Sequence, residues 1–228
     1  MEIEEIEACF EQVKHSMFLA VVALETVKAS NACVSIFNGT KEGNIFNICR
    51  ESVYLRCIIE TRKILEHKKQ DKIANLDSII KEVDNNKKYY AEKHYQNNLE
   101  MELSWVENPY PEHEEKLRLF EEVCQETDAE EEKENFYKKI EELKSEWNKF
   151  WVDLTKSNPI KDNRDTLVHS FRRAEITMLP MNEVENLLNK IKWFVVQLEY
   201  IINDTSAHYD TLYKQSNEIA QLFWQHIQ

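Results

Sequence analysis

The residues of this chain with the clearest chemical potential form the hexapeptide R-D-T-L-V-H at positions 164–169. The guanidinium of Arg164 can hold a phosphate through paired hydrogen bonds, and the imidazole of His169 can move a proton near neutral pH. Cleavage of RNA without a metal ion needs both groups. Because an arginine and a histidine fall five residues apart by chance in many chains, the meaning of the pattern depends on its surroundings.

The spacing of Arg164 and His169 limits how they can act together. A five-residue step places two side chains about 140° apart around an ideal helix. A catalytic role therefore favours a helix end, a local bulge, or a second copy of the site from a partner subunit. On spacing alone, a structural interpretation is also open. In that interpretation Arg164 pairs with a carboxylate, an aspartate (Asp162 or Asp165) supports a helix N-terminus, and His169 lies in an interface.

The charge of the chain is unevenly distributed around this motif. The formal net charge is −13, which speaks against a nucleic-acid partner because phosphate contacts supply most of the affinity for nucleic acids. Acidic side chains dominate residues 112–146, whereas residues 156–173 are mainly basic. The field near the motif can therefore be positive although the molecule is acidic. The basic residues of this stretch are Lys156, Lys161, Arg164, Arg172 and Arg173, against Asp162 and Asp165.

The elements that must position the motif are predicted to be helices. The 228 residues include only 2 Gly and 4 Pro, whereas a strand-rich chain needs turn residues every 8 to 12 positions, or roughly 20 in all. Apolar residues recur in steps of three and four over residues 3–27, 136–154 and 184–202, the spacing of an amphipathic helix. We therefore expect an all-α helical bundle of six to eight helices.

Further helices are expected over residues 45–67, 71–99 and 206–227. The segment 45–67 is apolar on several faces, which predicts a central place in the bundle. The last helix carries Leu212, Ile219, Phe223 and Ile227 as its apolar residues. We expect residues 1–228 to form a single domain, with residues 86–146 as a polar, acidic helical excursion.

Several functional classes are not predicted. The chain has no glycine-rich phosphate loop, no H-E-x-x-H and no E-x-x-H, and no two of its histidines are three or four residues apart. Neither a metal nor a cofactor is therefore expected. The longest apolar run spans residues 17–24, short of the roughly 20 residues that cross a bilayer, and the acidic N-terminus is unlike a secretory signal. Five cysteines without a C-x-x-C pair, four of them in apolar helical stretches, suggest small buried residues in a reducing, cytoplasmic setting.

The stretch N-R-D-T-L-V-H-S at residues 163–170 resembles the signature of the HEPN superfamily, in which an arginine and a polar residue are followed by three to five residues and a histidine. The rest of the chain is similar to the abortive-infection U-type (AbiU-like) branch of that superfamily. The likeness includes a long apolar first helix and the segment V-Y-L-R at residues 53–56. It also includes a proline-broken link, at Pro180, from the motif into a helix rich in leucine and isoleucine.

The resemblance implies a metal-independent endoribonuclease that acts as a toxin or phage-defence (abortive infection) effector. Two copies of the motif would face each other across a homodimer, and the ribose 2′-OH would attack the adjacent phosphate to leave a cyclic phosphate. His169 would be the general acid or base, Arg164 would hold the scissile phosphate, and Asp165 would orient one of them or cap the helix. Three residues would hold flanking phosphates, or simply form a solvated basic surface: Lys161, Arg172 and Arg173.

The implied partners are an RNA substrate such as tRNA or mRNA, a second copy of the chain, and an antitoxin or defence-system protein, but neither DNA nor a membrane. In the branch silenced by nucleotidyltransferase antitoxins, a tyrosine follows the histidine by two residues. Phe171 occupies that position here, so silencing by tyrosine nucleotidylation is not predicted. Two alternatives stay open: a non-catalytic HEPN-fold scaffold that binds RNA or protein, and an unrelated helical protein that uses the acidic residues 112–146 as a partner surface, although such a run is usually a solvated helix.

Overall fold

The computed structural model describes residues 1–65, 74–105, 114–156, 180–205 and 209–225. Within these ranges every regular element is a helix, so the predicted all-α fold is confirmed. The single-domain organisation of residues 1–228, with residues 86–146 as an excursion, stays a prediction.

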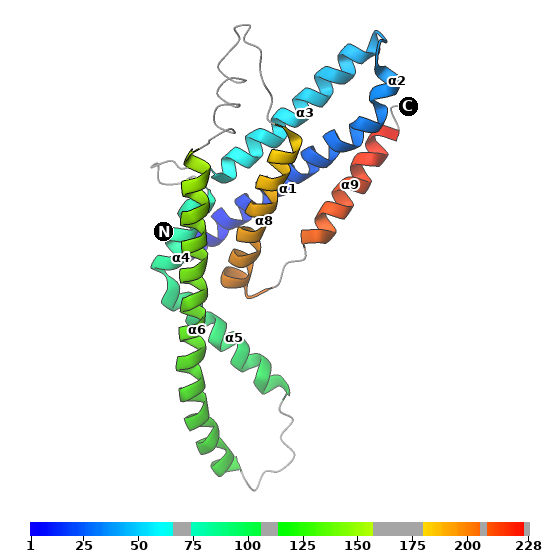
Figure 1. Cartoon of the computed structure of the whole chain (residues 1–228). Helices are drawn as coiled ribbons and strands as arrows, with labels where there is room; N and C mark the ends of the chain where they lie inside the picture. Colours follow the sequence, from blue (N-terminus) through cyan, green and yellow to red (C-terminus); the bar gives the residue numbers. More distant parts are fainter. Residues whose placement is uncertain (66–73, 106–113, 157–179, 206–208, 226–228) are drawn as a thin grey trace.

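The first helix, α1 (Ile3–Ser30), lies at the centre of the molecule, where it contacts α3, α4, α8 and α9 (Figure 1). The three-four spacing found in the sequence is its buried face. The fully or almost fully buried residues on this face are Ile6, Phe10, Val13, Met17, Ala20, Leu24 and Val27. By length and composition, residues 3–37 are also apolar enough to cross a membrane. Half of this apolar stretch is buried against neighbouring helices.

The helix predicted over residues 45–67 is α3 (Glu42–Leu65), and its expected central place is wrong for its first half. Ile45 and Ile48 are 67% and 63% exposed, and Cys49 is exposed as well. The second half, from Tyr54 to Leu65, buries most of the residues that α3 packs against α1. In the first half, Phe46 is buried in a separate small cluster with Cys33 and Trp224. Apolar side chains on several faces therefore do not make this helix central, because α1 already occupies the centre.

A short connection of a 3-10 helix (Asn31–Cys33) and α2 (Val34–Phe37) leads from α1 into α3. Gly39 adopts a φ of 80°, which L side chains rarely tolerate. Gly43, the second residue of α3, lies so close to the preceding turn that a Cβ there would be 2.4 Å from the carbonyl oxygen of Phe37. Both glycines of the chain thus make this one reversal possible.

The helix predicted over residues 71–99 is two helices, α4 (Leu76–Asn85) and α5 (Lys87–Trp105). The break is at Asn86, whose side-chain amide donates to the carbonyl of Glu82 at 2.8 Å. Asparagine competes with helical backbone bonding in this way, so it can end a helix without a glycine or a proline. At the start of α4, the Asn75 side chain accepts a hydrogen bond from the backbone N–H of Ser78 at 2.8 Å.

The acidic stretch and the long apolar-patterned helix after it form one helix, α6 (Glu114–Lys156), of 43 residues. Its predicted apolar face is buried at Phe136, Ile140, Leu143 and Trp147. That face packs onto α4, α5 and α8. The far ends of α5 and α6 extend away from the other helices (Figure 1).

The last two helices are α8 (Met181–Asn203) and α9 (Tyr209–Gln225). Pro180 precedes α8 as predicted, and Asp204 ends it with a left-handed φ of 55°. The apolar face expected for the last helix is wrong at Ile219 and Phe223, which are 58% and 52% exposed. The buried face is instead one residue on, at Ala220 and Trp224.

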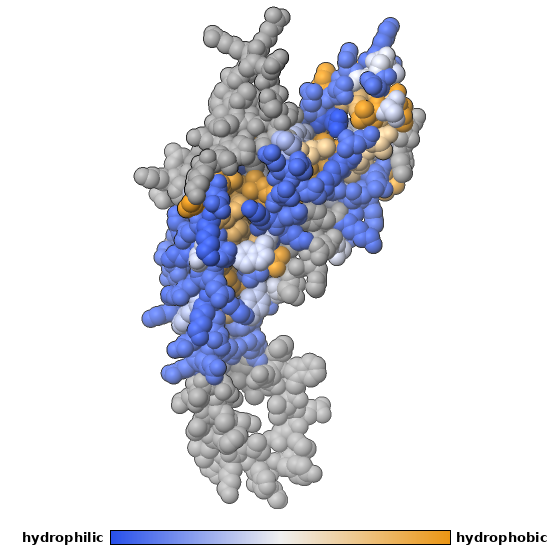
Figure 2. Space-filling model, viewed as in Figure 1, coloured by the Kyte–Doolittle hydropathy of each residue, from blue (hydrophilic) through white to orange (hydrophobic). Residues whose placement is uncertain are grey.

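The surface seen in Figure 2 is hydrophilic over most of its area, with apolar side chains near the α2–α3 end and again in the middle of the view, beside α6. The exposed isoleucines Ile36, Ile45 and Ile48 belong to that end.

The cysteines only partly follow the prediction of burial. Cys33 and Cys57 are buried, but Cys49 is exposed, because it lies on the outward side of α3.

Candidate functional site

All six residues assigned to the site from the sequence lie in residues 157–179, outside the described residues. They are Lys161, Arg164, Asp165, His169, Arg172 and Arg173. The structure describes the two flanking helices: α6, which ends at Lys156, and α8, which begins at Met181.

The two flanking helices are joined by a cluster of aromatic rings. The Trp147 and Phe194 ring centroids are 5.1 Å apart in an edge-to-face arrangement, and those of Phe150 and Phe194 are 5.4 Å apart. Trp147 also donates its indole N–H to Asp77 of α4 at 3.1 Å. Such ring pairs add specific geometry to the burial of apolar area. The ring cluster therefore packs against each other the two helices that flank residues 157–179.

The first turn of α8 is tied to α1 and α9 by a charged network. The Lys28 ammonium lies 3.0 Å from a Glu25 oxygen and 2.5 Å from a Glu185 oxygen. Asn217 of α9 donates to the other Glu25 oxygen at 2.7 Å. Burial lowers the pKa of Lys28, but hydrogen bonds and charges from Glu185 and Glu25 outweigh it, so the pKa is raised. The lysine therefore stays charged and holds three helices together.

Tyr54 of the V-Y-L-R segment on α3 is buried within electrostatic range of Glu183 in this turn. Burial raises the pKa of Tyr54, and the charge of Glu183 on α8 adds to the shift. Arg56 is a salt-bridge partner, with its guanidinium 2.7 Å from the carboxylate of Glu60. The Glu60 side chain is almost wholly buried and is also paired with Lys63 at 3.0 Å. The two cations compensate the buried carboxylate, as a buried charge requires.

Another histidine, His94, which the sequence analysis did not single out, lies in a polar cluster. The Nδ1 of His94 on α5 is 2.6 Å from the Asp204 carboxylate, which accepts a hydrogen bond from it. The Tyr200 hydroxyl and the Asn98 amide each lie 3.2 Å from Nε2. The ring stacks on Phe136 of α6 at 4.6 Å. We call these five residues the His94 cluster.

A histidine paired with an aspartate is a common acid–base unit, but this one is placed for structure. His94 is only 8% exposed, and protein groups already engage both of its nitrogens. No ring nitrogen is left for a substrate. Among the described residues, no group of three or more His, Cys, Asp or Glu side chains is placed to hold a metal ion.

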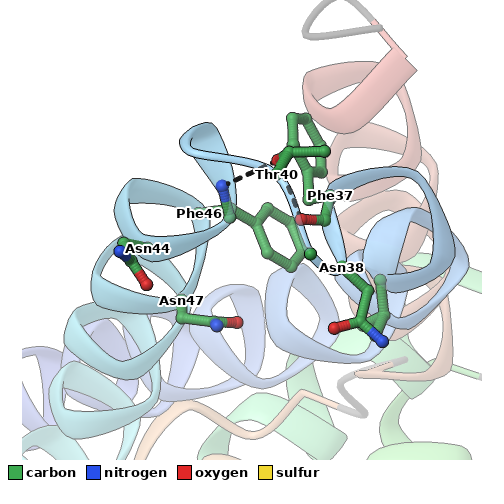
Figure 3. Close-up of a pocket in the computed structure, with 9 residues that line it drawn as sticks. Phe37, Asn38, Thr40, Asn44, Phe46 and Asn47 are labelled. Atoms are coloured by element: carbon green, nitrogen blue, oxygen red, sulfur yellow. Dashed lines mark hydrogen bonds between the residues drawn. The ribbon is translucent and has the colours of Figure 1, made fainter.

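A small pocket of about 260 Å³ lies at the reversal between α2 and α3 (Figure 3). Its walls carry the amides of Asn38, Asn44 and Asn47 and the stacked rings of Phe37 and Phe46. No charged side chain lines it. Because the pocket has no cation to pair with the phosphates of RNA, it is not a candidate extension of an RNA-binding site at residues 164–169.

The AbiU2 model of the HEPN proteins matches residues 3–223 of this chain. Comparisons with curated proteins and with solved structures give no match. The family match spans both described helices that flank residues 157–179 and the motif between them. Because it covers nearly the whole chain, the protein belongs to the AbiU2 family of HEPN proteins.

Proposed function

We propose that this protein is a metal-independent endoribonuclease that acts in the cytoplasm as a toxin or phage-defence effector. The observation that carries the proposal is the R-D-x-x-x-H motif at residues 164–169 in a chain of the AbiU2 family. The basic bias of residues 156–173 supplies a local attraction for RNA in an acidic protein.

In the proposed reaction, the ribose 2′-oxygen loses its proton and bonds to the adjacent phosphorus, and the bond from phosphorus to the 5′-oxygen breaks. His169 takes the first proton or returns one to the departing 5′-oxygen. Arg164 binds the scissile phosphate and stabilises the negative charge that develops on it. Asp165 orients one of these residues, while Lys161, Arg172 and Arg173 bind neighbouring phosphates.

The first test is an assay of the purified protein with tRNA or total RNA in the presence of EDTA. We expect cleavage products that end in a cyclic phosphate, and we expect His169→Ala and Arg164→Ala each to abolish them. His15→Ala is the matched control, because His15 is an exposed histidine on α1. Cleavage that survives both motif substitutions would refute the site assignment.

The spacing argument adds a second test, of the composite site. Arg164→Ala and His169→Ala proteins are each prepared alone and then mixed so that subunits exchange. If one subunit supplies the arginine and the other the histidine, half of the dimers regain one intact site, and about a quarter of the wild-type activity returns. No recovery, together with a monomeric mass in solution, would contradict the dimeric site.

A second candidate function is a non-catalytic HEPN-fold scaffold that binds RNA or protein. The formal net charge of −13 favours it, because such a charge weakens RNA capture over most of the surface. RNA binding in EDTA without any cleavage product would support this function instead. An antitoxin that acts by tyrosine nucleotidylation fits neither candidate, because Phe171 replaces the tyrosine.

A further inference from the structure

The helices that flank the motif segment enclose a second pocket, which no assignment above uses. It has a volume of about 430 Å³ and lies between α6 and α8. The rings of Phe150, Trp193 and Phe194 form its apolar wall. Trp193 is 44% exposed, so a large part of an indole is accessible at the surface. We refer to this space as the α6–α8 pocket.

The charges around the α6–α8 pocket are not equivalent. Lys149 is neutralised by Glu146, whose carboxylate lies 2.6 Å from its ammonium. Asp153 adds a negative charge on the α6 side of the pocket. Lys190 of α8 makes no ion pair with any described residue, and its ammonium lies 5.8 Å from the centre of the Phe150 ring. The lining as a whole carries two lysines and two acidic side chains, and Lys190 is the lysine that no described carboxylate pairs with, beside aromatic rings.

This combination matches an unpaired nucleotide better than other ligands. Every base has a π-face that can stack on an aromatic side chain, and the phosphate next to it pairs with a lysine. An apolar partner helix would cover Lys190 without neutralising it, which is unfavourable for a buried charge. A base-paired duplex keeps its bases stacked inside. The chemistry of the pocket therefore selects single-stranded nucleic acid.

The position of the pocket connects it with the motif segment. Phe150 is six residues before the end of α6, or about 9 Å along the helix axis. Trp193 is twelve residues after the start of α8, or about 18 Å along its axis. A strand bound between the two flanking helices can therefore extend from the ends of the motif segment toward this pocket.

We propose that the α6–α8 pocket is an RNA subsite that holds one unpaired base against Trp193 and its phosphate against Lys190. The choice of RNA as ligand rests on the proposed ribonuclease function. The stacking on Trp193 and the ion pair with Lys190 are inferred from the residues that line the pocket. The subsite would favour substrates with an unpaired nucleotide near the cleavage point, which restricts cleavage to loops, ends and single strands.

The test measures binding of a fluorescent single-stranded RNA oligonucleotide to the full-length His169→Ala protein, which removes turnover. Trp193→Ala and Lys190→Gln should each weaken binding about tenfold, within the range reported for loss of base stacking. Lys190→Gln should also reduce the slope of log affinity against log salt by about one. Trp193→Phe, which keeps a stacking face, should retain most of the affinity.

Two matched controls lie far from the pocket: Phe223→Ala, an exposed aromatic residue on α9, and Lys41→Gln, an exposed lysine before α3. Neither should change RNA binding. Unchanged affinity in both Trp193→Ala and Lys190→Gln would overturn the subsite, as would a change in self-association at Trp193→Ala with RNA binding intact. A protein that binds RNA through these residues but never cleaves it would keep the subsite and refute the ribonuclease. A protein that cleaves RNA, but whose RNA binding does not depend on Trp193 or Lys190, would keep the ribonuclease and refute the subsite.

Discussion

The helices around α1 and the junction where α5 meets α6 and α8 are held together by different kinds of contact. The core around α1 consists mainly of apolar side chains, with Phe10 and Leu24 wholly buried, and the Lys28 network joins α1 to α8 and α9 beside it. The junction is centred on the His94 cluster, where a histidine, an aspartate and a tyrosine hydroxyl exchange hydrogen bonds. One region depends on buried area and the other on aligned polar groups.

The difference predicts two levels of stability in one molecule. Full burial of a large apolar side chain contributes about 1.5–3 kcal/mol, whereas a typical hydrogen bond contributes about 0.5–1.5 kcal/mol net. The junction should therefore open at a lower free energy than the core. Leu154, near the end of α6, and Met181, the first residue of α8, pack against the apolar core, so the described ends of the two flanking helices belong to the more stable region.

The largest effect is expected from a core deletion. Phe10→Ala removes a wholly buried ring from α1 and should lower the free energy of unfolding by about 3–5 kcal/mol. Phe18→Ala is the matched control on the same helix, since Phe18 is 40% exposed, and it should cost about 0.5 kcal/mol. Urea denaturation measures both. Equal losses from the two substitutions would show that α1 is not the centre of the core.

A smaller and more local effect is expected at the junction. Asp204→Gly removes the carboxylate that accepts from His94 but keeps the left-handed backbone, with its φ of 55°, free of strain. The loss should be about 1–3 kcal/mol. Amide hydrogen exchange should accelerate in α5 and stay unchanged in α1. Asp204→Asn, which tolerates the same backbone and can still accept, should lose less.

The rate of alkylation of Cys57 shows whether the core opens together with the junction. Burial raises the pKa of the Cys57 thiol to about 12, so it should resist alkylation while the core is closed. Cys49 is exposed and serves as the reactive reference. Rapid labelling of Cys57 in Asp204→Gly would contradict the distinction between core and junction.

The sequence predicted the elements whose apolar residues form one stripe. The spacing from Ile6 to Val27 located α1 and its buried face, and Pro180 located the start of α8. The prediction failed where local pattern does not determine the neighbours. Ile45 on α3 is exposed because α1, not α3, lies at the centre of the bundle. The break at Asn86 is not marked by a glycine or a proline in the sequence.

The same limit applies to the candidate site, where only residues close together in the sequence could be predicted. Arg164 and His169 are recognisable from their types and spacing alone. His94 and Asp204 are 110 residues apart in the chain, so no local pattern could pair them. The α6–α8 pocket depends in the same way on which faces of two separate helices meet at Phe150 and Trp193. Chemistry within one segment can be read directly, whereas chemistry between helices needs their packing.

The smallest effect, with the opposite sign, is expected at Tyr90, the point where α5 joins the core. Its ring is wholly buried and its hydroxyl makes no hydrogen bond to a described residue. Tyr90→Phe removes this unpaired group and should raise the free energy of unfolding by about 1 kcal/mol at neutral pH. Tyr89→Phe is the control, because Tyr89 is 46% exposed, and it should change nothing.

The pH dependence at Tyr90 determines which kind of contact holds the start of α5. Burial, followed by the charges of Glu7 and Tyr89, raises the pKa of Tyr90 in the folded chain. The folded chain then holds the proton to a higher pH than the unfolded chain, so this contribution to stability is complete below about pH 10 and is lost as pH rises further. The advantage of Tyr90→Phe over wild type should therefore widen above that pH in denaturant titrations. A variant that is less stable at neutral pH would mean that the hydroxyl has a partner and that the polar junction reaches the start of α5.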